Sequence, residues 1–583
     1  PRPPCTPPNP SPSSTPTSKP MPSPKKSPKP RPAAPAAAAP AAPAVAPAAA
    51  APPAAPVAHA AATAIAGGLL IPPAGGAVVR MYRIGHGDCF LIAFAGDSRP
   101  VYVLIDCGYK PGSPAFIGTT PKAITRNIRE ATGGVIDVGV ITHEHQDHVN
   151  GISASNFEGI TFREVWMAWT EDPQDPLANQ LRALFNDTLL GLVEARNQLA
   201  AAGDDSRSNA VDDFLEFELG GDEDAPFNPT EARNQLLSLG AAGGGSKNKQ
   251  SMKLFKDKAG GNVRYLRPHE AAHTIADASN LRVFSMGPPM DKDRLSDLDP
   301  VGSEEFHLSM GFSSPHNYLA SALKGQQQDD VSAQPPFNRR YYVPLEDIAS
   351  AKEEVSAFYS THYKAAAGTA PEPSPAPQPD EAATRREVAA DAEWRRIDNE
   401  WLYASEQLAL AMNNATNNAS LVLAFELSPG GKVLLFGGDA QRGNCISWNN
   451  GTWSDGNRVV NTRDLLSRTV LYKVHHHASH NGTLNGKVTD DYPNLGWMGQ
   501  QQHASEFTAM ITAVRAWAQT QKGWNHPYPP IKDALKLKAS GRILQTDEPV
   551  ASMTMPATAS PSEWQRFLSR VSETSLYFDL IVN

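Results

Sequence analysis

The chain has 583 residues, enough for more than one domain, and it carries a formal net charge of −9. This acidic balance argues against a protein that coats nucleic acid non-specifically. It does not exclude a local basic groove or phosphate binding through a metal ion.

The composition also predicts the compartment. The four cysteines are too few and too scattered for a disulfide framework or a structural zinc site, so we expect buried free thiols. We find no secretion signal and no apolar run long enough to span a bilayer. The sequence therefore predicts a soluble, cytoplasmic protein that does not interact with membranes.

The N-terminal segment, residues 1–75, consists almost entirely of Pro, Ala, Ser and Thr with a few Lys. Such a segment cannot bury enough apolar surface to offset its chain entropy, so we expect a disordered, partly polyproline tail. Residues 1–87 contain eight Lys and Arg and no Asp or Glu. A basic anchor and a solubilising linker are both consistent with this pattern.

The folded part begins with short β-strand patterns. Strands are predicted at 77–83, 89–95 and 101–106, separated by Gly-containing turns as in an antiparallel meander. An amphipathic helix over 121–131 precedes a strand at 135–141. This strand–helix–strand step favours an α/β layer architecture.

Two helical stretches interrupt the strand pattern. Residues from about 170 to 280 are helical and low in complexity, with the strongest helix over 177–202. A strand at 281–286 follows, and residues from about 290 to 415 form a second insertion that ends in a helix over 381–413. Both stretches read as insertions into the β-rich framework.

The C-terminal third returns to strands. The predicted strands are 420–427, 432–436, 470–474, 542–546 and 576–582. The predicted helices are 505–519 and 531–539.

Three of the predicted strand ends carry metal-binding side chains. The first is the motif His-Glu-His-Gln-Asp-His at 143–148, which directly follows an apolar run. The second is Asp439, which two glycines separate from its strand, and the third is His476 or His477. Imidazole nitrogen and carboxylate oxygen suit Zn²⁺ and, with more oxygen, Mn²⁺ or Fe²⁺. Three imidazoles on one loop are hard to explain as packing, because each unpaired buried imidazole costs free energy.

These motifs, in this order, resemble the metallo-β-lactamase superfamily, whose hallmark is His-x-His-x-Asp-His with a later Asp and His. Within it the chain is most similar to the metallo-β-lactamase domain of the ComEC DNA-uptake channels. The matching segments are residues 83–92 ("VGQGDxxLI"), 105–108 ("DxG"), 417–423 ("NNxSLVL"), 438–439 ("GD"), 473–479 ("KVxHHGS") and 525–527 with 546–547 ("HP…TD"). They are collinear from residue 81 to residue 547.

The resemblance implies an α/β fold, a four-layer αβ/βα sandwich over residues 76–583, with two divalent cations at one edge of the packed sheets. The implied ligands are His143, His145 and Asp439 for one ion, and Asp147, His148, Asp439 and His476 for the other. The motif alignment favours His476 over His477. Ala478 stands where the family usually has Gly, and the family's third His of the first half-site is not visible; His269 is the nearest candidate.

The two cations, most simply zinc ions, imply a hydrolytic mechanism. A hydroxide that bridges two cations forms near neutral pH, because the metals lower the pKa of water from about 15.7 to roughly 7. We expect Asp147 to orient that water and His526 to contact the substrate or protonate a leaving oxygen. A His before Pro527 also fits a simple loop cap. The residues expected to support the ligands from outside are Asp106, His86, Asp88, His477 and Ser479.

Three functions remain open on the sequence. The first is a metal-dependent phosphodiesterase or nuclease of the ComEC-like type, with a phosphodiester such as nucleic acid as substrate. The second is a hydrolase of a carboxylic ester, lactone, thioester or lactam, which uses the same ligands. The third is a non-catalytic binding or assembly protein on a degenerate hydrolase scaffold, whose helical insertions contact a protein partner. A basic, roomy groove favours nucleic acid, whereas a small apolar pocket favours an acyl substrate.

Overall fold

The computed structural model describes residues 65–66, 68–116, 118–221, 227–237, 245–295, 297, 405–521, 524–557 and 559–583. Within these ranges the chain is a mixed α/β protein with helices and several sheets. Most of the predicted tail and of the second insertion lies outside the described residues. The end of the predicted tail is ordered into two short antiparallel strands, β1 (Ile65–Ala66) and β2 (Leu69–Leu70).

The larger sheet contains eight strands among the described residues. In spatial order they are β17 (Val571–Glu573), β18 (Tyr577–Val582), β3 (Ala77–Tyr82), β4 (Phe90–Phe94), β5 (Val101–Ile105), β6 (Val135–Val140), β7 (Thr161–Ala168) and β8 (Val263–Leu266). β3, β4 and β5 form the predicted antiparallel meander, and β5 to β8 pair in parallel. Because β8 is part of this sheet, the helical insertion ends before it rather than near residue 280.

The smaller sheet contains six described strands. Their order is β16 (Ile543–Gln545), β15 (Thr508–Ile511), β14 (Thr469–Lys473), β11 (Val433–Phe436), β10 (Val422–Glu426) and β9 (Arg282–Gly287). The predicted helix over 505–519 is wrong, since β15 occupies its centre and only α15 (Arg515–Ala518) is helical. The short apolar run at 508–511 fits either structure, and pairing with β14 and β16 decides for a strand.

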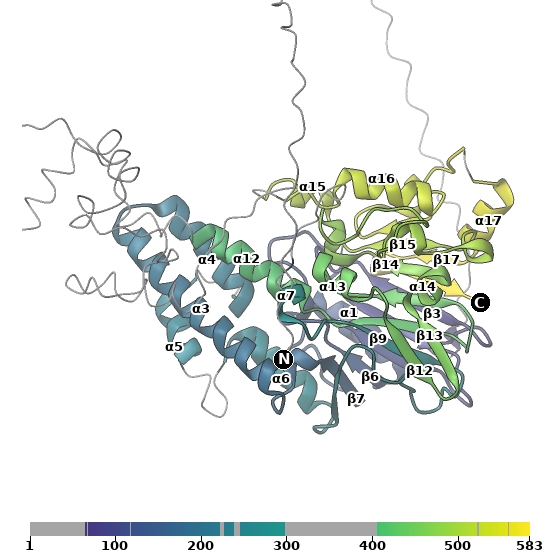
Figure 1. Ribbon diagram of the computed structural model, residues 1–583, viewed down its shortest axis with the longest axis horizontal. Helices are drawn as coiled ribbons and strands as arrows, with labels where there is room; N and C mark the ends of the chain where they lie inside the picture. Colours follow the sequence, from purple (N-terminus) through teal and green to yellow (C-terminus); the bar gives the residue numbers. More distant parts are fainter. Residues whose placement is uncertain are drawn as a thin grey trace, which may run out of the picture. The chain divides into compact units, whose positions relative to one another are not determined.

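The two sheets pack face to face through the inward side chains of their strands. The Phe90 and Phe436 rings are 5.3 Å apart between centroids, and those of Phe94 and Phe425 are 5.4 Å apart. Side chains alternate across each strand, so the outer faces also need cover. The covering helices are α1 (Pro121–Thr132) and α6 (Lys247–Asp257) on the larger sheet, and α13 (Arg442–Ser447), α14 (Thr462–Ser467) and α16 (Pro529–Lys538) on the smaller one (Figure 1).

Four helices form a separate cluster with its own apolar core. They are α3 (Pro176–Ala201), α4 (Asp205–Leu219), α5 (Pro229–Leu237) and α12 (Ser405–Asn418), and they lie side by side (Figure 1). Leu192, Val211, Leu215 and Met412 are among the buried residues of this core. The first three helices come from the first insertion and α12 from the end of the second, so both insertions build one helical module. Among the described residues, no helix is both long and apolar enough to cross a bilayer.

Smaller elements connect these layers. They are α2 (Gln146–Val149), η1 (Trp169–Glu171), α7 (Lys292–Leu295), the hairpin β12 (Thr452–Asp455) and β13 (Arg458–Asn461), the 3₁₀ turns η6 (His475–Ala478), η7 (Leu495–Trp497), η8 (Gln501–His503) and η9 (Val550–Ser552), and α17 (Pro561–Ser569). Cys89, Cys107 and Cys445 are buried and free.

A buried ion pair joins β3 to its neighbour β18, the last strand of the chain. The Arg80 guanidinium donates to Asp579 at 2.7 and 2.8 Å, and both side chains are at most 2% exposed. We expect Asp579→Ala to lower the free energy of unfolding by about 3–5 kcal/mol, because it leaves an uncompensated buried charge. Urea denaturation measures this loss. The control Asp257→Ala removes the exposed partner of Lys253 and should cost no more than about 0.5 kcal/mol. Equal costs for the two variants would refute the expectation.

Candidate metal centre

The three predicted strand ends meet at one edge of the two sheets. The 143–148 loop follows β6 and turns into α2, whereas Asp439 follows β11 and His477 follows β14. Gly438 makes the close approach possible: its φ is 50°, and a Cβ there would lie 2.7 Å from the Thr142 side chain. The loops of the two sheets therefore touch directly at this edge.

Asp147, His148, Asp439 and His477 form a buried cluster whose ligand atoms all lie within 4.8 Å of one another. The His477 Nε2 atom is 3.2 Å from Asp147 Oδ2 and 3.2 Å from Asp439 Oδ2. The His148 Nε2 atom is 3.3 Å from Asp439 Oδ2. Among the described residues, Asp147 Oδ1 and His148 Nε2 have no hydrogen-bond partner.

The outer ring nitrogens of both histidines are held by acceptors. The Nδ1 atom of His148 lies 2.8 Å from Asp106 Oδ2, and that of His477 lies 2.9 Å from the carbonyl oxygen of Thr512. Each Nδ1 therefore carries a hydrogen, and each Nε2 is directed at the cluster, where it holds a proton in the metal-free protein and would offer its lone pair to a bound cation. Asp106 is fixed in turn by the backbone N–H and hydroxyl of Thr142, at 2.8 and 2.6 Å. This is the usual outer support of a metal-binding imidazole.

His143 and His145, which the sequence predicts as ligands of one ion, lie beside this cluster but belong to neither group of potential ligands among the described residues. The Nε2 atom of His143 and the Nδ1 atom of His145 lie 3.0 Å apart, and the Ser420 hydroxyl lies 3.2 Å from Nδ1 of His143. The outer nitrogen of His145 is 2.9 Å from the Glu218 carboxylate, which is fully buried. The Phe217 ring packs on His145 with a centroid separation of 4.6 Å.

Glu218 lies beside the candidate site, and the sequence analysis missed it. It lies in α4 of the helical module, 73 residues after His145, and no motif surrounds it. Its position is fixed because the Asn248 amide of α6 donates to the carbonyl oxygens of Phe217 and Glu218 at 3.0 and 3.1 Å. The helical module thus contributes directly to the site.

The negative charge of the cluster's carboxylates is balanced either by protons on the neighbouring imidazoles or by a bound cation. Burial opposes the charged form of His148, but Asp439, Asp106 and Asp88 outweigh it and hold its pKa well above 6.5. In the same way, Asp439 and Asp147 overcome burial and raise the pKa of His477 to about 9. The neighbouring imidazoles hold the pKa of Asp147 and Asp439 below the usual range, against the effect of burial. The carboxylates therefore stay ionised and require positive charge beside them.

The donor set fits a divalent cation. Two imidazole nitrogens and two carboxylates, with buried ligand atoms left unpartnered, are the arrangement that Zn²⁺ takes in proteins. A neighbouring group of Asp88, Asp106 and His148 fits less well. The Lys473 ammonium lies 2.5 Å from Asp88 and 2.7 Å from the carbonyl oxygen of Gly438, so that group already holds a positive charge.

The structure differs from the prediction that favoured His476 over His477 as the ligand. The two ring nitrogens of His476 lie 3.1 Å from amide groups of Asn417 and Asn481. His477 instead faces the carboxylates. The cause is the backbone, since His476, His477 and Ala478 have φ values of 47°, 50° and 62°, which non-Gly residues rarely adopt. The left-handed backbone at these three successive residues turns the His477 imidazole into the cluster.

Of the remaining predicted residues, Asp88 and His86 lie beside the cluster, whereas Ser479 and His269 contact other groups. Asp88 accepts a hydrogen bond from the Thr512 hydroxyl at 2.6 Å, and the His86 ring lies 4.4 Å from His477. The Ser479 hydroxyl faces His480 rather than a ligand. His269 packs on Trp453. Thus His269 does not supply the missing third imidazole.

His526 lies beside this cluster. Its ring is 6.5 Å from that of His477 and 5.5 Å from that of His476, between centroids. Burial, His476 and His477 hold its pKa well below 6.5. A neutral imidazole suits a hydrogen bond to a substrate better than delivery of a proton to a leaving oxygen.

Comparison with known proteins does not assign this chain to a family. The chain matches no protein-family model and no curated protein. The interpretation of the site therefore rests on its residues and their arrangement.

The contrast between His476 and His477 is testable by metal binding. We expect His477→Ala to weaken Zn²⁺ binding by more than the roughly 10–100-fold cost of losing an outer partner, because it removes a ligand atom. His476→Ala should change the affinity by no more than about threefold, since amides hold that ring. Competition with a chromophoric chelator, together with elemental analysis, measures both. The reverse order of the two variants would restore the original ligand assignment.

The metal-free protein should lose stability as the pH rises from about 6.5 to about 9. His477 has its pKa raised from 6.5 to about 9 by folding, so its protonated form stabilises the fold fully below pH 6.5 and progressively less up to pH 9. Thermal unfolding of chelator-treated protein across this range measures the decline. Saturating Zn²⁺ should remove it, because the cation replaces the proton. A melting temperature that stays constant over this window without metal would contradict the assignment.

Proposed function

We propose that the chain is a metal-dependent hydrolase with the four-layer metallo-β-lactamase sandwich. Two sheets packed face to face, helices on both outer faces and ligands at the sheet edge support this class. The observation that carries the proposal is the buried cluster of Asp147, His148, Asp439 and His477, in which ligand atoms are left unpartnered. A divalent cation bound there lowers the pKa of water and neutralises charge on a reacting oxygen.

Within that class we propose a phosphodiesterase, most simply a nuclease of the ComEC-like type. The residues around the cluster support an anionic substrate. The Lys110 ammonium lies 3.6 Å from the centroid of the Phe217 ring and 5.8 Å from that of Trp524. None of the described carboxylates lies within ion-pair distance of Lys110, although Asp147, Asp213, Glu216 and Glu218 act on it from further away. Burial lowers its pKa to about 8, so it remains cationic at neutral pH.

Half-buried aromatic groups complete this side of the site. Trp524 stacks on His526 at 5.1 Å between centroids, and Trp517 meets Trp524 edge to face at 5.7 Å. Planar rings beside a cation suit a nucleobase next to its phosphate, because every base offers a face for stacking. We propose that Lys110 contacts a non-bridging phosphate oxygen and that His526 contacts the substrate.

Hydrolysis of a phosphodiester needs an attacking water, and the carboxylates of the cluster are placed to orient it. Asp147 has one oxygen beside His477 and one without a hydrogen-bond partner among the described residues, so it can orient an attacking water. Lys473 holds Asp439 from behind at 3.4 Å and keeps its carboxylate ionised. The buried position of these groups excludes bulk water from the carboxylates.

A parallel substrate assay tests the proposal. Purified protein with its bound metal is offered plasmid DNA, RNA, bis-p-nitrophenyl phosphate and a chromogenic lactam. We expect cleavage of the phosphodiesters, reduced by about 10²–10⁴-fold in Asp147→Ala, the loss typical of removing a group that positions or activates water. Lys253→Met, an exposed change on α6, serves as the control with unchanged rate.

The outcomes separate the competing functions. Turnover of the lactam alone would end the phosphodiesterase proposal and favour the acyl hydrolase. Protein without metal that leaves every substrate intact would favour a binding or assembly protein, for which the helical module offers a surface to a protein partner.

A further inference from the structure

A polar cavity of about 520 Å³ lies between α3 and α6, apart from the metal cluster. Its volume is within the range of sites that bind small molecules. Residues three or four apart on each helix share one face, so both helices present a row of side chains to it. These are Asn179, Arg182 and Asn186 of α3 and Lys249, Met252 and Lys256 of α6, with Glu171 and Tyr265 at the ends.

The three cations of the cavity are only partly compensated. Arg182 donates to the carbonyl oxygens of Thr170 and Asp172 and to the Asn179 side chain, which fixes the guanidinium without neutralising it. Among the described residues, no carboxylate forms an ion pair with Arg182 or Lys256. Lys249 meets Glu144 at 3.6 Å. Each cation is half-buried, so solvent screens this mutual repulsion incompletely.

Glu171 shows that these charges share one electrostatic environment. Burial and the nearby Glu144 raise its pKa, while Lys249, Arg182 and Lys256 act in the opposite direction. Two carboxylates, Glu171 in the cavity and Glu144 beside Lys249, therefore face three cations in a chain whose overall charge is −9. The local excess of positive charge favours an anion.

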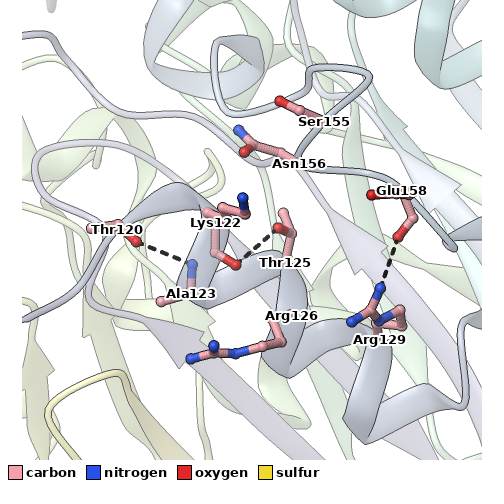
Figure 2. Close-up of a pocket in the computed structure, with 9 residues that line it drawn as sticks. All are labelled: Thr120, Lys122, Ala123, Thr125, Arg126, Arg129, Ser155, Asn156 and Glu158. Carbon is pink, nitrogen blue, oxygen red and sulfur yellow. Dashed lines mark hydrogen bonds between the residues drawn. The ribbon is translucent and has the colours of Figure 1, made fainter.

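A second basic hollow, of about 300 Å³ beside α1, is less suited to this role. Its cations, Lys122, Arg126 and Arg129, are all exposed. Figure 2 shows that they diverge: Arg129 turns to the Glu158 carbonyl, and Arg126 points away from Ser155 and Asn156. Of these two hollows, the one between α3 and α6 surrounds its space with half-buried cations.

We propose that the cavity between α3 and α6 binds a phosphate-bearing anion, either inorganic phosphate or the phosphate of a mononucleotide. Phosphate oxygens accept charge-assisted hydrogen bonds from ammonium and guanidinium groups, and those from Asn179 and Asn186 amides add direction. The half-buried Tyr265 ring offers a flat apolar face to a nucleobase and nothing comparable to free phosphate. We therefore expect a nucleotide to bind more tightly.

Calorimetric titration of the full chain tests this site. The protein is kept in excess chelator, so that phosphate cannot bind through a metal ion at the other site, and is titrated with inorganic phosphate, AMP and adenosine. We expect phosphate and AMP to bind, AMP more tightly, and adenosine not to bind. Lys256→Met should weaken phosphate binding by about tenfold, the effect of losing one charged hydrogen bond.

Lys253→Met is the matched control, because it changes the same helix on its exposed face, where Lys253 pairs with Asp257 at 2.6 Å. It should keep the wild-type affinity, and Lys249→Met should reproduce the loss seen for Lys256→Met. Equal affinities for phosphate and AMP would identify free phosphate as the ligand. No binding of either to the wild-type chain, or equal binding by wild type and Lys256→Met, would overturn the proposal. Neither result depends on hydrolase activity.

Discussion

Buried carboxylates that stay ionised need positive charge within a few ångströms, and this requirement organises the edge where the two sheets meet. Asp147 and Asp439 are each about 2% exposed, and isolated charges at such depth are costly. The imidazole of His148 lies next to Asp147 in the chain, and the His477 imidazole and the Lys473 ammonium reach the two carboxylates from β14 and the turn after it. The loops of both sheets are therefore joined by electrostatics as well as by the apolar core. A bound divalent cation would supply the same positive charge beside the carboxylates, and the two imidazoles would then not need to be protonated.

The local motifs could be predicted from the sequence because their geometry is local. A strand followed by a His-rich loop, and Gly-Gly-Asp after another strand, each place ligands within a few residues of a regular element. The choice between His476 and His477 could not be predicted from the sequence, because it depends on left-handed backbone at three non-Gly positions. Glu218 gave no signal at all, since a glutamate in an ordinary helix acquires its role only when tertiary packing brings it to His145.

The fold was predictable to a similar degree. The meander, α1 and most strands follow from alternation and turns, whereas residues 508–511 carry an apolar run too short to distinguish helix from strand. The joining of the two insertions into one helical module involves packing between α12 and α4, which are far apart in the sequence. No local pattern encodes such a contact.

Glu218 also bears on how far this protein can be shortened without disturbing the candidate site. A fragment trimmed to the two sheets and their covering helices would keep every residue of the His-rich loop, yet it would leave the outer nitrogen of His145 without its acceptor. The ring could then rotate, and its inner nitrogen would no longer be directed at His143. The inserted helices therefore support the candidate site, and shortening the gene at their boundaries removes a residue that holds one of its imidazoles.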